Sequence, residues 1–254
     1  MKNTKILLAL LLLAITATTT SCLSDDDDKT YTMDGYFTIA GTGFNYTLYR
    51  DGGGVVTPSA SSVSAITDNK GFGDKKRAYL YLTYKEANYS VNEKNEIKLD
   101  QAELQSGFYL DTKNIISKEE ADRASITLKD SIFAIKVFDN VWADNGYVTA
   151  AISAYYDVKS GKGIDPDINM VFSPEDIKEN AIKFHIYYNR HNVPDTTPYG
   201  PYTFVKTFPL DAFISMIPGS GDIEMTFEVD GGPASKTIKV SRSKMKAPGL
   251  FYAN

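Results

Sequence analysis

The residue types that most often carry chemistry are scarce in this chain of 254 residues, which has one cysteine, two histidines and one tryptophan. The cysteine is Cys22, close to the start of the chain, and the histidines are His185 and His191. One cysteine excludes an intramolecular disulfide framework and a cysteine-rich zinc site. Acids are plentiful, with 32 Asp and Glu against 27 Lys and Arg, so a pair of carboxylates alone does not mark a catalytic site.

The surroundings of Cys22 indicate an export signal. Lys2 and Lys5 precede an apolar run over residues 6–15, which is too short to span a membrane because a spanning helix needs roughly 20 residues. The four residues that end at Cys22 resemble a bacterial lipobox, although the first of them, Thr19, stands where leucine is usual. The resemblance implies that Cys22 is lipidated and becomes the new N-terminus, anchored by acyl chains such as palmitate. The alternative is an ordinary secretory signal with an unrelated cysteine.

An acidic run follows the cysteine. It consists of Ser24, Asp25, Asp26, Asp27 and Asp28. The run resembles the signal that sends Bacteroides-type lipoproteins to the outer face of the outer membrane, and it also reads as a flexible acidic tether over residues 22–32. The same letters spell an enteropeptidase site of expression tags. Without the signal peptide, 25 basic and 32 acidic residues leave a net charge of −7, which argues against nucleic acid as a partner.

Motifs for catalysis or cofactor binding are not found in the rest of the chain. His185 lies in a predicted strand, on the face opposite the apolar one, and a zinc site there or at His191 would need a third ligand from elsewhere. His191 and Asn192 are interpreted as residues that fix a loop by hydrogen bonds to the backbone. Residues 165–169 begin like a calcium loop, but Met170 replaces the required glycine. We expect no catalytic residue, no metal and no cofactor.

Period-two alternation of apolar and polar residues dominates the mature chain and predicts an all-β fold. Ile223, Met225 and Phe227, for example, alternate with polar residues and give the strand one dry face. We expect strands at 36–39, 45–50, 78–84, 96–99, 107–110, 133–138, 146–156, 182–188, 202–208, 223–229 and 237–240. Two short helices are expected at 117–124 and 173–180, because each stretch begins with a capping-box pattern.

The order of several short stretches resembles the NigD-like lipoprotein family. The stretches are Arg50-Asp51-Gly52 with Pro58, the strand 77–84, Val141-Trp142, Asn145-Gly146-Tyr147-Val148, Arg190-His191-Asn192 with Asp195, and Phe208-Pro209-Leu210. The resemblance implies an N-terminal OB-type barrel followed by a C-terminal β-sandwich. A charged stretch over 116–129 divides the chain into 33–124 and 125–254. The chain departs from the family by extra residues at 91–104 and 161–176.

Function is implied only coarsely by this resemblance. The family has no established enzymatic activity, and its name comes from a bacteriocin-associated gene cluster, which hints at immunity or surface interaction. His191, Asn192 and Trp142 are the family positions expected to have a structural or interaction role. The first hypothesis is a non-enzymatic surface lipoprotein of the outer membrane that binds an unknown protein or glycan. The alternatives are a glycan-binding accessory lipoprotein of a polysaccharide-capture system and, third, a hydrolase.

Two further features concern carbohydrate. The stretch Tyr79-Leu80-Tyr81 could stack on sugars if exposed, but tyrosine is also a good strand former, so cross-strand packing is the favoured interpretation. Asp130-Ser131-Ile132 and Asp195-Thr196-Thr197 resemble the short O-glycosylation acceptor motif of Bacteroides-type exported proteins. Ser131 and Thr196 are therefore candidate acceptors.

Overall fold

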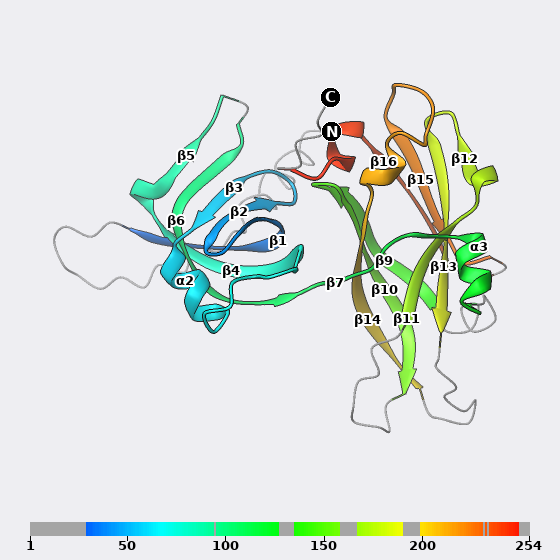
Figure 1. Ribbon diagram of the computed structural model, residues 1–254, viewed down its shortest axis with the longest axis horizontal. Coiled ribbons are helices and arrows are strands. Elements are labelled where there is room, and N and C mark those ends of the chain that lie inside the picture. The colour runs from blue at the N-terminus through cyan, green and yellow to red at the C-terminus, as the bar shows by residue number, and fades with distance from the viewer. Residues whose placement is uncertain are drawn as a thin grey trace, which may run out of the picture.

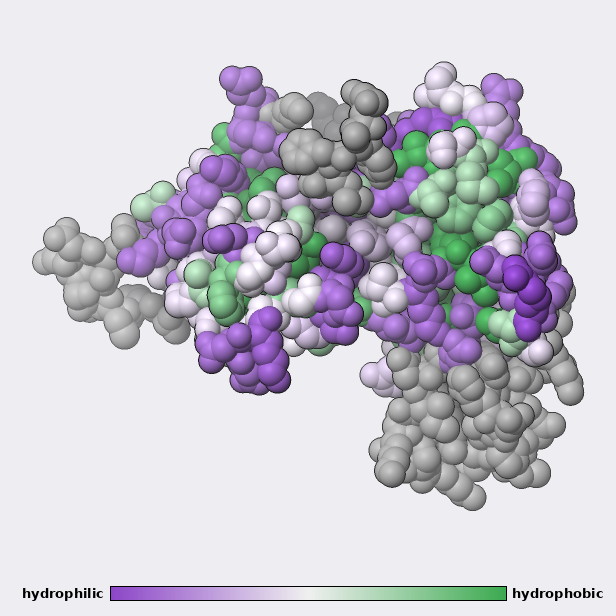
Figure 2. Space-filling view, viewed as in Figure 1, coloured by the Kyte–Doolittle hydropathy of each residue, from purple (hydrophilic) through white to green (hydrophobic). Residues whose placement is uncertain are grey.

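The computed structural model contains two bodies, an N-terminal barrel and a C-terminal sandwich (Figure 1). The structure describes residues 29–93, 95–126, 135–157, 167–189, 199–230, 232 and 234–248. No helix within these ranges is long and apolar enough to cross a membrane. On the face shown in Figure 2, hydrophilic residues cover much of the barrel, and apolar residues gather over the upper part of the sandwich.

The barrel is a closed sheet with one helix. Its elements are β1 (Thr30–Thr42), β2 (Asn45–Arg50), β3 (Val55–Pro58), α2 (Ala60–Ile66), β4 (Arg77–Lys85), η1 (Glu86–Asn88), β5 (Tyr89–Val91) and β6 (Ile97–Tyr109). The strand order is β3-β2-β1-β4-β6-β5, and a parallel pairing of β3 with β6 closes the sheet. The predicted OB-type barrel is confirmed.

Alternation along β4 separates the core of the barrel from its outer surface. Ala78, Leu80 and Leu82 point inward and are buried, whereas Tyr79 and Tyr81 point outward. The buried residues of the barrel core include Phe37, Ile39, Leu48, Val56, Val63, Phe72, Leu99 and Leu104. Alternation along β4 therefore places two tyrosines on the surface.

The C-terminal body has two packed sheets. Its elements are β7 (Asp111–Thr112), β8 (Ile116–Ser117), α3 (Lys118–Arg123), β9 (Ile135–Asp144), β10 (Tyr147–Asp157), β11 (Asp167–Phe172), η2 (Pro174–Asp176), β12 (Ile177–Lys178), β13 (Ala181–Asn189), β14 (Tyr199–Pro209), η3 (Asp211–Phe213), β15 (Ile223–Glu228), β16 (Ser235–Val240) and η4 (Arg242–Met245). One sheet has the order β7-β14-β10-β9 and the other β16-β15-β13-β11-β8. Apolar residues of both sheets form one core, which confirms the predicted sandwich.

The linker between the bodies is part of the sandwich. Strand β7 pairs in parallel with β14 in one sheet, and β8 pairs in parallel with β11 in the other. These pairings give the backbone of the linker partners on two sheet edges. The sequence division at residue 124 placed this segment with the barrel, whereas residues 111–112 and 116–117 pair with strands of the sandwich.

The two predicted helices have different outcomes. The first is confirmed as α3, where Ser117 and Glu120 form the expected reciprocal capping box. The second, expected over 173–180, is only the single turn η2, although its capping box is present. The chain then extends as β12 because Ile177 and Lys178 pair with β13.

Candidate functional site

Most residues singled out in the sequence lie outside the described ranges. They are Cys22, Ser24, Asp25, Asp26, Asp27, Asp28, Ser131, His191, Asn192 and Thr196. Trp142 is described, on β9, and it lies where the two bodies meet. The roles expected for the other residues stay predictions, so the candidate site is built from the described surface around Trp142.

Four aromatic side chains form a continuous strip on the outer face of the barrel. We call Tyr36, Tyr79, Tyr81 and Phe108 the aromatic strip. The β1–β4 register pairs Tyr36 with Tyr79, and the β4–β6 register pairs Tyr79 with Phe108. Ring centroids are 4.8 Å apart for Tyr36 and Tyr79, 5.3 Å for Tyr79 and Tyr81, and 5.5 Å for Tyr79 and Phe108. The last pair is stacked, with 15° between the ring planes.

A β-bulge in β6 places Phe108 in this strip. Tyr81 pairs with Ser106 and Leu82 with Leu104, so Gln105 is an extra residue without a partner on β4. Without the extra residue, the alternation that turns Leu104 inward would also turn Phe108 inward. The bulge instead leaves Phe108 outside, with 54% of its surface exposed, next to Tyr81 with 46% exposed.

Hydrogen-bonding side chains border the strip. The Tyr79 hydroxyl donates to the carboxylate of Asp34, and this bond raises the pKa of Tyr79 above the ordinary tyrosine value. Gln105 Nε2 donates to Thr83 Oγ1 at 3.0 Å on the same outer face. The strip therefore combines exposed apolar rings with amide, hydroxyl and carboxylate groups.

The strip ends at a buried polar junction between the two bodies. Arg77 donates to both carboxylate oxygens of Asp51, at 2.7 and 2.5 Å, and its side chain is fully buried. Its guanidinium also donates to Thr38 of the barrel and Thr149 of the sandwich, each at 2.9 Å. Trp142 Nε1 donates to Asp51 at 2.8 Å, and its ring lies 4.9 Å from that of Tyr36. The ion pair thus holds Trp142 against the first residue of the strip.

The β9–β10 turn completes the junction. Asn145 Nδ2 lies within hydrogen-bond distance of the backbone oxygens of Tyr49 and Arg50, at 3.3 and 3.2 Å, and of Asp51 Oδ1 at 3.2 Å. Asn145 and Gly146 both have positive φ, at 48° and 83°, as a tight hairpin turn requires. A Cβ on Gly146 would lie 2.4 Å from the backbone nitrogen of Ala247, so only glycine fits. The stretches that carry the family resemblance in the barrel and in β9–β10 therefore meet at one interface.

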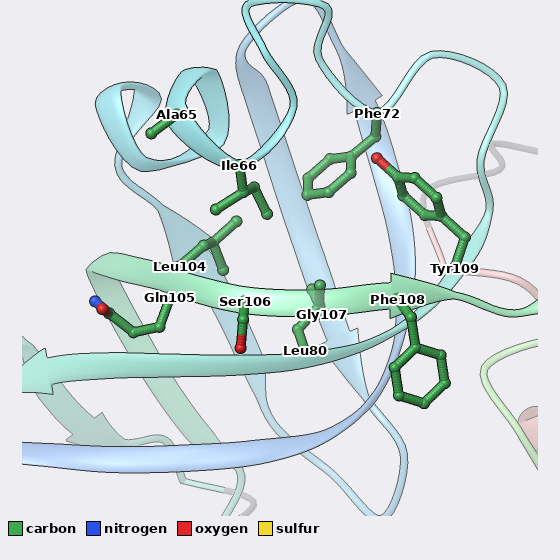
Figure 3. Close-up of a pocket in the computed structure, with 10 residues that line it drawn as sticks. All are labelled: Ala65, Ile66, Phe72, Leu80, Leu104, Gln105, Ser106, Gly107, Phe108 and Tyr109. Carbon is green, nitrogen blue, oxygen red and sulfur yellow. The ribbon is translucent and has the colours of Figure 1, made fainter.

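A groove opens on the other side of β6, under helix α2 (Figure 3). Its volume is about 480 Å³, and its lining is Ala65, Ile66, Phe72, Leu80, Leu104, Gln105, Ser106, Gly107, Phe108 and Tyr109. A Cβ on Gly107 would lie 2.5 Å from the Tyr79 backbone oxygen, so glycine allows β6 to lie close to β4 here. The ring of Phe108 points away from the groove (Figure 3). The lining offers apolar volume rather than a paired acid and base.

Comparison with known proteins places the fold. No family model and no curated protein matches the sequence. Among solved structures, a toxin-related protein from Parabacteroides distasonis covers 84% of this chain and 95% of its own, with 17% identity and a TM-score of 0.54. A Bacteroides fragilis protein assigned as a lipoprotein covers 83% and 97%, with 11% identity and a TM-score of 0.55. At these identities the two matches show a shared fold.

The solved structures that match also include a NigD-like protein. It is an immunity protein from Bacteroides caccae, which covers 82% of this chain and 92% of its own, with 15% identity and a TM-score of 0.47. The structural neighbours thus contain a member of the family to which the sequence was likened.

Proposed function

We propose that this protein is a non-enzymatic lipoprotein of the outer membrane, anchored through Cys22 and exposed on the cell surface, and that the aromatic strip is its binding surface. One observation carries the binding role: Tyr81 and Phe108 are both about half exposed within an ordered row of rings. Exposed apolar side chains that form a contiguous patch often mark interaction sites, whereas single scattered ones are common on protein surfaces. The descriptions of the neighbours as a lipoprotein, an immunity protein and a toxin-related protein support the coarser part of this assignment.

Carbohydrate is the ligand class that the strip fits best. The half-exposed rings of Tyr81 and Phe108 offer apolar surface against which the C–H face of a sugar can pack. Beside them, Asp34 accepts hydrogen bonds, and Gln105 and Thr83 both donate and accept them, as sugar hydroxyls require. OB-type barrels are known to bind oligosaccharides as well as nucleic acids. The acidic mature chain favours the first of these two ligand classes.

Glycan-array binding tests this assignment. Wild type is compared with the double variant Tyr81→Ala/Phe108→Ala and with Tyr202→Ala, which removes a tyrosine that is 56% exposed on the sandwich. We expect wild type and Tyr202→Ala to bind the same glycans and the double variant to lose them. Equal binding by all three proteins would show that the strip is not the glycan site.

A protein partner is the second candidate. Tyrosine-rich, half-exposed surfaces are also typical of protein interfaces, and the strip runs to the rigid junction at Trp142. A pull-down from the cell surface with the same three proteins distinguishes this case. Capture of one defined partner by wild type and Tyr202→Ala, without glycan binding, would replace carbohydrate by protein as the ligand.

The anchor and the surface location need separate experiments. Cys22→Ala should abolish lipid labelling and membrane retention, because the thiol is the proposed acylation site. Replacement of Asp25 to Asp28 by alanine should reduce the access of an external protease on intact cells. Unchanged retention would contradict the anchor, and equal digestion of both forms would contradict the export role of the acidic run.

A further inference from the structure

A histidine among three carboxylates lies on the sandwich, away from the aromatic strip. We call His185, Asp176, Glu228 and Asp230 the His185 cluster. The parallel pairing of β13 with β15 aligns His185 with Glu228, and Asp230 follows two residues later. The turn η2 supplies Asp176. Asp176 lies nine residues before His185, whereas Glu228 and Asp230 lie at the end of β15 and just after it, so the fold brings four possible metal ligands together.

Both ring nitrogens of His185 face a carboxylate oxygen. Nδ1 lies 2.7 Å from Asp230 Oδ1 and 3.9 Å from Glu228 Oε1, and Nε2 lies 3.0 Å from Asp176 Oδ2. A neutral imidazole carries only one N–H group. The other ring nitrogen is an acceptor, as is the carboxylate oxygen that faces it. A proton or a metal ion must therefore lie between these two atoms.

The arrangement around Nε2 resembles the outer shell of a metal-bound histidine. In the tautomer with the proton on Nε2, Asp176 accepts from His185, and it also accepts from the backbone N–H of Ser173 at 3.0 Å, so its position is fixed. The side chains of His185 and Asp176 are each only 14% exposed. Metal-ligating histidines usually donate their second N–H to such a carboxylate, which orients the ring and raises its basicity. This leaves Nδ1 as the ligand atom.

The charge around Nδ1 also favours a cation. Asp176, Glu228 and Asp230 bring three negative charges, and the ion pair of Glu228 with Lys183, at 2.9 Å, supplies one positive charge. A divalent ion would neutralise the remaining charge of the cluster around a neutral His185.

We propose that the His185 cluster binds Zn²⁺ through His185 Nδ1 and the carboxylates of Glu228 and Asp230, with Asp176 orienting the ring. Ligand atoms about 2.0–2.2 Å from a tetrahedral zinc lie roughly 3.3 Å from one another. The observed distances of 2.7 and 3.9 Å from Nδ1 lie on either side of this value, and the three ligand atoms all lie within 4.8 Å of one another. The fourth position of the zinc is left for water.

Calorimetric titration with ZnCl₂ tests the site. The full chain carries Cys22→Ser so that no thiol competes, and it is compared with His185→Ala, Asp176→Asn and Glu224→Gln. Glu224→Gln is the matched control, because it removes an exposed carboxylate from β15, the strand that also carries the proposed ligand Glu228. We expect one zinc per chain, at least a 100-fold loss of affinity in His185→Ala, a 10–100-fold loss in Asp176→Asn and no change in the control.

Circular dichroism confirms the fold of each variant, and His185→Gln replaces His185→Ala if the latter does not fold. Absence of zinc binding to the wild type, or equal binding by wild type and the His185 variant, would overturn the proposal. In that case a proton, not a metal ion, joins Nδ1 to the carboxylates.

Discussion

The domain junction and the aromatic strip touch through the rings of Trp142 and Tyr36, yet they use their side chains in opposite ways. At the junction, the buried guanidinium of Arg77 donates to three side chains, and one of these belongs to the other body. In the strip, Tyr81 and Phe108 remain about half exposed. The difference indicates that the junction fixes the two bodies together, whereas the strip retains area for a ligand.

The largest expected effect breaks the junction. Arg77→Ala would leave the Asp51 carboxylate buried without its charge partner, which typically costs about 3–5 kcal/mol. Chemical denaturation should show this loss in the free energy of unfolding. Arg123→Ala is the control, because Arg123 and Glu119 are 70% and 83% exposed, and it should change stability by less than about 0.5 kcal/mol. Similar losses in both variants would contradict a structural role for the junction.

A smaller effect is expected at the β9–β10 turn. Asn145→Ala removes the amide that faces the backbone oxygens of Tyr49 and Arg50, and the loss of such a hydrogen bond typically costs about 0.5–1.5 kcal/mol. Asn95→Ala controls for the backbone, since Asn95 has a similar φ of 59° but is exposed. Thermal unfolding should show a clearly larger loss for Asn145→Ala. Equal losses would mean that the turn conformation alone explains the effect.

Stability should be nearly insensitive to the exposed rings of the strip. Phe108→Ala removes a ring that is 54% exposed, so the free energy of unfolding should fall by less than about 1 kcal/mol. Denaturant titrations of Phe108→Ala and Arg77→Ala side by side compare the two regions directly. A loss for Phe108→Ala as large as that for Arg77→Ala would show that the strip is structural.

The smallest effect is confined to alkaline solution. The hydrogen bond to Asp34 raises the pKa of Tyr79 in the folded state. The contribution of this hydrogen bond to stability is therefore fully present below the ordinary tyrosine pKa of about 10. This contribution is lost as the pH rises through the raised value. Burial raises the pKa of other tyrosines too, such as Tyr147, so ultraviolet titration of the variants is compared with that of the wild type. One late-ionising contribution should disappear in Tyr79→Phe and move to lower pH in Asp34→Asn. An unchanged titration curve in Asp34→Asn would contradict the hydrogen bond.

The strands and the two bodies could be predicted because period-two alternation is local information. Ile223, Met225 and Phe227 are buried in β15 as their spacing requires. Most residues of the junction, but not Thr38 and Thr149, had also been noted through their order along the chain. Their meeting depends on how two separate sheets pack, which no local pattern encodes.

Other features had no local signal. The bulge at Gln105 changes which face Phe108 occupies, and a single extra residue leaves little trace in an alternating pattern. Helix α2 has no acidic residue in its first turn and no basic residue in its last, so only its N-cap, Ser59, marks its start. Asp176 lies nine residues before His185, but Asp230 lies 45 residues after it, so spacing along the sequence did not reveal the proposed ligands.

The most direct test of the account is the affinity of one array-selected glycan for Phe108→Ala and for Tyr202→Ala, with the melting temperature of each variant measured alongside. We predict at least a 10-fold loss of affinity for Phe108→Ala, none for Tyr202→Ala, and nearly unchanged melting temperatures for both. An affinity of Phe108→Ala equal to that of the wild type would contradict the aromatic strip as the binding surface.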